Sequence, residues 1–312
     1  MLIAFKLKLL LACAAGLAGP IAVAPLVSDI GPRGAATEPA IVRIAPGSLS
    51  YREAGDFTRA GQQAEAPLRA MRFEKPLHIM QHQVSSSDYQ ICVQEGACRA
   101  LDRGVAIASD RPAVQVSWHD AEAYAGWLSR KTGHSYRLPS DAEWAFAAGS
   151  RFRDDGLPVD AADPSKRWIG RYERESERDL FDTTAYPFGR FGPNEHGIEG
   201  LAGNVWEWTS TCFVRSRIDE AGNAGRPTVN CGVRIAEGAH RAYVTDFIRD
   251  ARAGGCAQGV PPANLGFRLV REETSWVASV SARWGRTWLA SFSRSRPLPG
   301  AMPTALRRHG WA

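Results

Sequence analysis

The segment that most constrains this chain spans residues 197–209, GIEGLAGNVWEWT, which combines three glycines with two tryptophans. Glycines permit positive φ angles and close approach of other groups to the backbone. Trp206 and Trp208 flank Glu207, so its carboxylate lies between two large apolar side chains. A carboxylate cannot be buried without a compensating partner. The sequence therefore predicts that Glu207 is either a structural glutamate paired with an arginine or a metal ligand.

Three further segments accompany this one along the chain. They are VSWHDAEAY (residues 116–124), YRLPSDAEW (residues 136–144) and NLGFR (residues 264–268). Together with GNVWEWT they resemble, in the same order, the signatures of the formylglycine-generating-enzyme, or sulfatase-modifying-factor, family. The resemblance covers about residues 41–272. It implies an α+β domain, a variant of the C-type-lectin-like fold that is loop-rich, with short strands and few helices.

Local patterns predict where several elements begin and end. Ser140 followed by Glu143 is a capping box, so a helix is expected from there to about Gly149. Ser117 is expected to cap a helix that ends before Gly133, and the serines at 85–87 to cap another. Extended segments are expected at 41–51, 77–84, 111–116, 233–237, 242–245 and 265–270, with a long loop at 214–230.

The N-terminal end differs from the domain in composition. Residues 1–24 place Lys6 and Lys8 before an apolar stretch, which predicts an export signal that is either cleaved or retained as a membrane anchor. Residues 25–40 are rich in Pro, Gly and Ala and are expected to form a linker before the domain at 41–272. We therefore expect an exported, periplasmic protein.

The C-terminal end, residues 273–312, is a basic tail. From residue 274 onward it holds six arginines and no acidic residue, while the whole chain has a formal net charge of +5. Trp284, Trp288 and Phe292 recur every four residues and would line one helical face. Such a helix either packs on the domain or contacts an anionic membrane surface. An exported chain is not expected to bind nucleic acid.

Six cysteines are present, and Cys13 lies in the predicted export signal. Cysteines pair in oxidising compartments. The short spacing between Cys92 and Cys98 predicts a disulfide there. Two pairings stay open for the others: Cys212 with Cys231, which leaves Cys256 as the odd thiol, or Cys231 with Cys256.

The resemblance places the family's copper-binding cysteine pair in residues 238–252, but this segment holds no cysteine. Formylglycine generation through a dithiolate copper site is therefore not expected. The candidate catalytic residues are His240, Tyr243 and Cys256, which would need copper or iron in a divergent oxidoreductase. The same segment and the tryptophan of the first motif supply the candidate groove residues for a protein or peptide partner: Trp206, Arg241, Thr245, Asp246 and Arg249.

The resemblance also implies a calcium site in the first motif, formed by Gly203, Val205 and Glu207. Gly200 stands where the family has a side-chain oxygen, so one ligand is lost. Calcium takes six to eight oxygen ligands, and water could replace the missing one. The sequence thus favours an exported accessory or protein-modification factor that binds a protein or peptide. The alternatives are a divergent metal-dependent oxidoreductase and a non-catalytic lectin-like binding module.

Overall fold

The computed structural model describes residues 38–102, 104–153, 185–253 and 264–273, together with positions 163, 166 and 169. These residues belong to one compact unit, Ala36–Ala312. The expected export signal, most of the linker, the basic tail beyond residue 273 and Cys256 lie outside them. No helix in the described part of the chain is long and apolar enough to cross a bilayer.

A four-stranded antiparallel sheet joins the two ends of the described domain. Its order is β1 (Ile41–Ile44), β6 (Leu77–Met80), β12 (Val270–Glu272) and β7 (Ser135–Arg137). β12 is short, yet it pairs with β6 through Val270 and Ile79 and with β7 through three residue pairs. The last strand of the domain is therefore held between strands from its first half.

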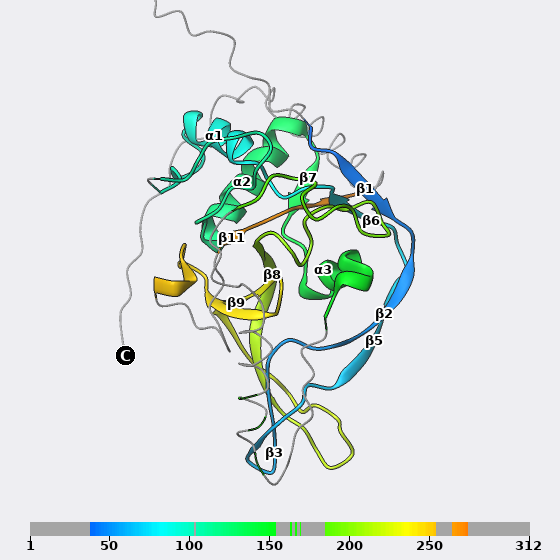
Figure 1. Ribbon diagram of the computed structural model, residues 1–312. Helices are drawn as coiled ribbons and strands as arrows, with labels where there is room; N and C mark the ends of the chain where they lie inside the picture. The colour runs from blue at the N-terminus through cyan, green and yellow to red at the C-terminus, as the bar shows by residue number, and fades with distance from the viewer. Residues whose placement is uncertain are drawn as a thin grey trace, which may run out of the picture. The chain divides into compact units, whose positions relative to one another are not determined.

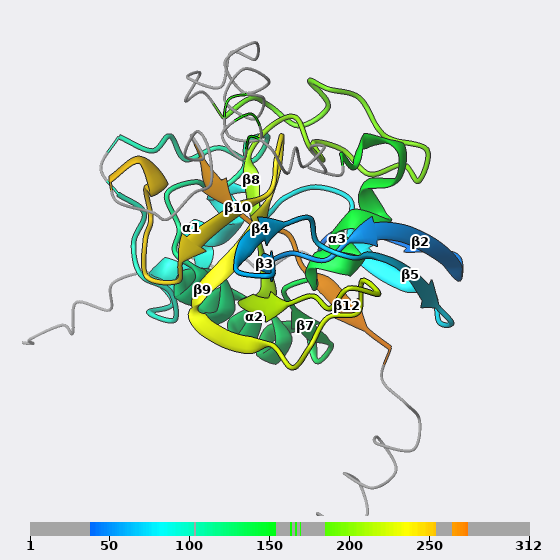
Figure 2. The ribbon, with the colours of Figure 1, turned by 90° about the horizontal axis from the view of Figure 1, so that it is seen from below.

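The second sheet is built around a long hairpin of β8 (Trp206–Arg217) and β9 (Thr228–Glu237). β10 (Ala242–Thr245) extends it beyond β9, while β3 (Asp56–Arg59) and β4 (Gln62–Ala64) extend it beyond β8. β11 (Leu265–Gly266) pairs in parallel with the start of β8. A separate ribbon is formed by β2 (Gly47–Arg52) and β5 (Leu68–Phe73), which run side by side in Figures 1 and 2.

Three α-helices occur in the described residues: α1 (Ser86–Gln94), α2 (Trp118–Thr132) and α3 (Asp141–Ala148). Two short 3₁₀ turns, Gly149–Arg151 and Ala251–Ala253, are also present. The expected capping box of Ser140 and Glu143 forms at α3, and Ser117, the expected cap of α2, forms a second one with Asp120. In Figure 1, α3 lies between the β2–β5 ribbon and β8, and it contacts both.

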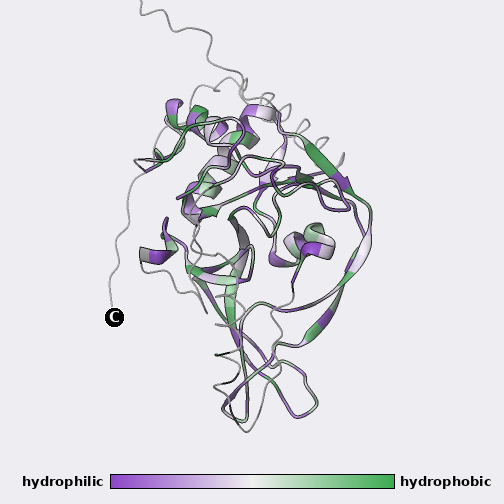
Figure 3. Cartoon of the chain, in the orientation of Figure 1, coloured by the Kyte–Doolittle hydropathy of each residue, from purple (hydrophilic) through white to green (hydrophobic). Residues whose placement is uncertain are grey.

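The main core lies between α2 and the part of the second sheet where β8 begins. Tyr124 of α2 packs against Tyr89 of α1 and against Phe267, with ring centres 5.8 and 5.5 Å apart. Trp208 is fully buried, and its indole N–H donates to the Val116 carbonyl at 2.8 Å. Figure 3 shows apolar and polar residues alternating along α2, as expected for a helix with one buried face.

The structure confirms the α+β class with short strands and few helices, and it also confirms the three capped helices. Several expected strands have other bounds in the structure. Residues 41–51 divide at Pro46 into β1 and β2, which belong to different sheets. Residues 77–84 are a strand only to Met80. Residues 111–116 contribute a single bridge from Pro112, and Gln115, with a positive φ of 57°, is not extended.

The second half of the domain departs further from expectation. The expected loop at 214–230 includes the end of β8 and the start of β9, and residues 265–270 divide into β11 and the start of β12. Arg268 stands between these two short strands, where its side chain enters a buried polar network.

Candidate functional site

Glu207 lies at the centre of a buried polar network. Arg268 donates from Nε to Oε2 at 2.6 Å and from Nη2 to Oε1 at 2.8 Å, and neither side chain is exposed. Gln83 Nε2 donates to Oε1 at 2.7 Å, and Trp144 Nε1 donates to Oε2 at 3.0 Å. Arg268 also donates to the carbonyls of Met80, Gln81 and Glu199. Of the two hypotheses for this glutamate, pairing with an arginine is the arrangement present.

This geometry does not fit a calcium ion bound by Glu207. Both carboxylate oxygens accept hydrogen bonds, and the guanidinium of Arg268 already balances the charge. A divalent cation at the same oxygens would meet a buried positive charge. The remaining expected ligands, Gly203 and Val205, have only backbone carbonyls to offer. Among the described residues, no group of three or more His, Cys, Asp and Glu side chains is placed to hold a metal ion.

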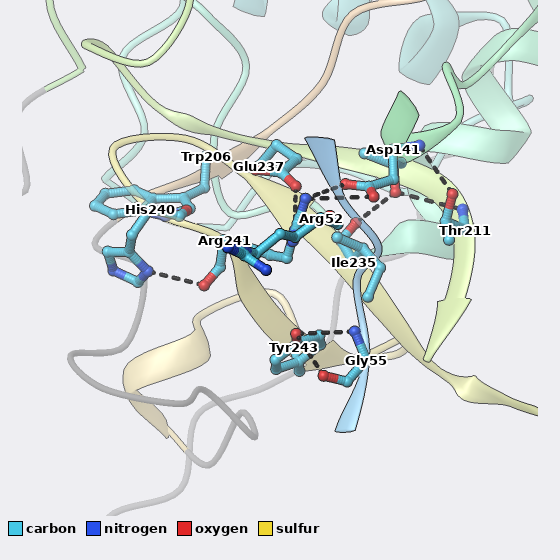
Figure 4. Close-up of polar contacts among 11 residues, drawn as sticks. Arg52, Gly55, Asp141, Trp206, Thr211, Ile235, Glu237, His240, Arg241 and Tyr243 are labelled. Carbon is cyan, nitrogen blue, oxygen red and sulfur yellow. Dashed lines mark hydrogen bonds and ion pairs between the residues drawn. The ribbon is translucent and has the colours of Figure 1, made fainter. Parts of the chain in front are cut away.

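His240 and Trp206 face each other beside β10. The two rings are 5.2 Å apart with an edge-to-face angle of 66°, and Trp206 Nε1 donates to the His240 carbonyl at 3.0 Å. His240 Nδ1 lies 3.0 Å from the Arg241 carbonyl (Figure 4). Both side chains are buried. The expected groove tryptophan and the expected catalytic histidine are thus brought together under the surface.

Arg241 is held in a second buried ion-pair network. Its Nε donates to Glu237 at 2.7 Å, its Nη1 donates to the Arg52 carbonyl at 3.1 Å, and its Nη2 lies 3.5 Å from Asp141 (Figure 4). Two carboxylates therefore face one guanidinium. This network borders a cavity of about 390 Å³, to which Tyr51 and Asp141 both contribute walls.

Tyr243 points to the same segment as Arg241. Its hydroxyl donates to the Gly55 carbonyl at 3.2 Å and accepts from the Gly55 N–H at 3.0 Å (Figure 4). Arg241 and Tyr243 thus both bond to the backbone of residues 52–55. The hydroxyl joins β10 to the turn between β2 and β3.

The remaining groove candidates lie at the other end of β10, near the start of α2. Arg249 is buried and donates to Asp120 at 2.7 Å and to Asp102 at 2.6 Å. Burial raises the pKa of Asp120, but hydrogen bonds from Arg249 and Ser117 outweigh it, so this pKa lies below its ordinary value.

Asp246 and Thr245 also fix this end of β10. The Asp246 carboxylate pairs with His119 at 3.2 Å, and its carbonyl accepts from the Trp118 N–H at 3.0 Å. Asp246 N–H donates to the Gly232 carbonyl, and the Thr245 carbonyl accepts from Ile248. These contacts give the turn after β10 a defined backbone.

Sequence reasoning missed the most exposed residue of this turn. Phe247 is 67% exposed, although it is a large apolar residue between two that make hydrogen bonds. It also missed Arg234, whose guanidinium carbon lies 3.8 Å from the centre of the Trp118 ring. An aromatic residue directly after Asp246 was the available signal, but exposure depends on the tertiary fold.

Two disulfides are present. Cys92–Cys98 confirms the pairing expected from spacing. Cys212–Cys231 selects one of the two pairings left open by the sequence.

Comparison with known proteins gives consistent matches. The family model described as sulfatase-modifying factor enzyme 1-like domain matches residues 27–273. The chain is 29% identical over 198 residues to the formylglycine-generating enzyme of Mycobacterium tuberculosis, covering 56% of this chain and 62% of that protein. It is 30% identical over 167 residues to the inactive C-alpha-formylglycine-generating enzyme 2 of Bos taurus, covering 49% and 53%.

Among solved structures, PvdO from Pseudomonas aeruginosa matches with a TM-score of 0.48 and 24% identity, over 75% of this chain and 95% of that one. The chain spans between 47% and 62% of the length of three of the curated relatives it matches.

Proposed function

The chain belongs to the sulfatase-modifying factor enzyme 1-like domain family, and from this premise we propose that it binds a protein or peptide partner as an accessory or protein-modification factor. Its relatives include both a formylglycine-generating enzyme and an inactive one. Residues 238–252 lack cysteine, so the proposal does not include the family's copper dithiolate chemistry.

One observation carries the proposal: Phe247 is 67% exposed on a turn that is held in place from several sides. Asp246 bonds to Gly232 and to Trp118, and Arg249 is buried in ion pairs with Asp120 and Asp102. Large aromatic side chains, Phe among them, are enriched at the cores of protein–protein interfaces, where a few residues carry most of the binding energy. They bind at low entropic cost because the backbone is already ordered.

The polar groups of the same segment support a binding role. Arg241, Tyr243 and Arg249 are engaged with Glu237, Gly55 and Asp120, so they shape the surface from below. We further propose that the protein acts outside the cytoplasm. Its two disulfides support this, because such bonds persist in oxidising compartments.

Peptide-display selection on the purified protein tests partner binding. Peptides enriched on the wild type should bind Phe247→Ala at least about tenfold more weakly, as expected for a hot-spot residue. Leu68→Ala is the matched control, since Leu68 is also a large apolar residue, 58% exposed, but lies on the β2–β5 ribbon. Equal affinity of the wild type and Phe247→Ala for every selected peptide would contradict the proposal.

The cavity beside Arg241 favours a second candidate, a lectin-like module that binds a small organic cation. Asp141 is buried, lines the cavity, and shares Arg241 with Glu237, which leaves this end of the cavity anionic. Primary amines and guanidines should raise the melting temperature of the wild type and not that of Asp141→Asn, because a ligand stabilises the state that binds it. If none of these compounds raises the melting temperature of the wild type, this candidate function is wrong.

A further inference from the structure

The disulfide Cys212–Cys231 lies at an irregularity in the β8–β9 hairpin. Cys212 is level with Arg234 in the ladder, but the next residue, Phe213, is already level with Asn230. Residues 231–233 therefore bulge from β9, and Cys231 is exposed while Cys212 is half-buried. The two residues of this disulfide therefore differ in exposure, and Cys231 is the one on the more open side.

A cation is held beside the sulfur of the half-buried cysteine, Cys212. Arg234 Nη1 donates to Cys212 Sγ at 3.1 Å and to the Ser210 carbonyl at 2.8 Å. The guanidinium stacks on Trp118, whose indole N–H donates to the Thr209 carbonyl at 3.0 Å. A guanidinium stays charged at neutral pH. A cation beside a cysteine sulfur stabilises its thiolate, and thiols of lower pKa leave faster in exchange reactions.

We propose that Cys212–Cys231 is a redox-active disulfide that exchanges with a thiol of a partner molecule. The thiolate of the partner attacks Sγ of Cys231 and forms a new S–S bond with it. The Cys212–Cys231 bond breaks, and its electron pair stays on Cys212 Sγ as a thiolate stabilised by Arg234. A second partner thiolate then attacks the partner sulfur, which leaves both cysteines reduced and releases the oxidised partner disulfide.

The second disulfide offers an internal comparison. Cys92 and Cys98 are 0% and 9% exposed and belong to the main core, so an attacking thiol has little access to either sulfur. Access and the basicity of the leaving thiol both control the rate of exchange. The two disulfides of one molecule should therefore differ in reactivity.

The reactive bond also lies next to the proposed binding surface. The Gly232 carbonyl, one residue from Cys231, accepts the hydrogen bond from the Asp246 N–H, and Phe247 follows directly. A protein bound at Phe247 would have its surface close to Cys231. That choice of partner rests on the proposed function, but the exchange reaction with a small thiol does not.

The test treats the full-length oxidised protein with reduced glutathione, quenches with acid, and maps the cysteines by mass spectrometry. Glutathione should appear on Cys231 rather than Cys212, and Cys212–Cys231 should open on the order of tenfold faster than Cys92–Cys98. Arg234→Met should slow the opening severalfold, and Arg234→Lys should slow it less. The control Arg226→Met removes an exposed arginine of the same hairpin and should match the wild type.

Three results would overturn the proposal: glutathione divided equally between Cys212 and Cys231, equal opening rates for the two disulfides, or an Arg234→Met variant as fast as the wild type. If Arg234→Met does not fold, the site of glutathione attachment in the wild type is the test: attachment at Cys231 supports the proposal, and attachment at Cys212 contradicts it. Because glutathione needs no docking at Phe247, the outcome is independent of peptide binding.

Discussion

At the scale of single residues, the Glu207–Arg268 pair shows why a buried charge specifies its neighbours. Removing two charges from water costs several kcal/mol each, and only good geometry with further hydrogen bonds offsets this cost. Here Gln83 and Trp144 donate the further hydrogen bonds to the Glu207 carboxylate, and the carbonyls of three residues accept those from the Arg268 guanidinium. The pair therefore fixes the relative position of β8 and the segment between β11 and β12.

Glu207→Gln should destabilise the protein by about 3–5 kcal/mol, because it leaves Arg268 charged and buried without its counter-ion. Urea unfolding monitored by tryptophan fluorescence measures the change. Glu38→Gln is the control, since the Glu38–Arg271 pair is half exposed and should contribute within about 1 kcal/mol. A wild-type melting temperature that rises with calcium and falls with chelator would instead support a metal at this motif.

Tyr243→Phe separates a structural from a catalytic role for this hydroxyl. If the hydroxyl joins β10 to Gly55, its loss should cost about 1 kcal/mol of stability, while affinity for the selected peptides stays unchanged. Thr132→Val is the control, because the Thr132 hydroxyl donates to the Leu128 carbonyl at the C-terminal end of α2, away from β10. If Tyr243→Phe is as stable as the wild type but no longer binds the selected peptides, the hydroxyl has a functional rather than a structural role.

The sequence predicted part of this residue-scale detail. A buried carboxylate between two tryptophans requires a partner that balances its charge, so it was predictable that Glu207 would have one. The identity of this partner was not predictable, because Arg268 is 61 residues away and the sequence alone does not say which arginine lies beside Glu207 in the fold. The exposure of Phe247 and the contact of Arg234 with Cys212 likewise arise only when distant strands pair.

At the scale of elements, local signals predicted the helices well and the strands poorly. A capping box is closed by residues three apart, so Ser117 with Asp120 and Ser140 with Glu143 are visible in sequence. β8 shows no alternation: its first four residues are all buried and most of the others are partly exposed. Its pairing with β9 depends on a turn in which Asp219 and Asn223 bond to each other.

The start of α2 should make stability depend on pH in the acid range. Asp120 accepts from Ser117 and Arg249, and its folded pKa lies below the ordinary value of 3.8. The unfolded chain therefore binds more protons at acid pH, so this stabilisation is complete above about pH 5 and is lost as pH falls through the folded pKa.

Asp120→Asn should accordingly be less stable than the wild type at pH 7, and the difference should shrink as pH falls below about 4. Urea unfolding across this pH range measures it. Ser117→Ala keeps the charge pair with Arg249 and should retain most of the wild-type pH dependence. A constant difference between Asp120→Asn and wild type at every pH would show that burial and packing, rather than ionisation, determine the effect.

At the scale of the whole molecule, composition and motifs identified the family and the fold class, while the ends of the chain carry predictions of another kind. Export rests on Lys6, Lys8 and the apolar stretch up to residue 24. Disulfide formation connects this prediction with the folded domain, because disulfides generally form and persist in oxidising compartments. The chain-entropy model gives about 2 kcal/mol for the loop closed by Cys92–Cys98 and about 3 for Cys212–Cys231.

Deleting residues 1–24 should therefore change both location and stability. The full chain, expressed in a bacterial host, should fractionate outside the cytoplasm with Cys92, Cys98, Cys212 and Cys231 all protected from alkylation. The truncated chain should stay in the reducing cytoplasm with these thiols alkylated, and its melting temperature should rise when the purified protein is oxidised, since each bond restricts the unfolded chain. Replacing Cys92 and Cys98 by alanine should remove part of that gain, and replacing Cys212 and Cys231 should remove the rest. Full-length protein recovered in the cytoplasm with reduced cysteines would contradict the proposed location while leaving the fold and the family unaffected.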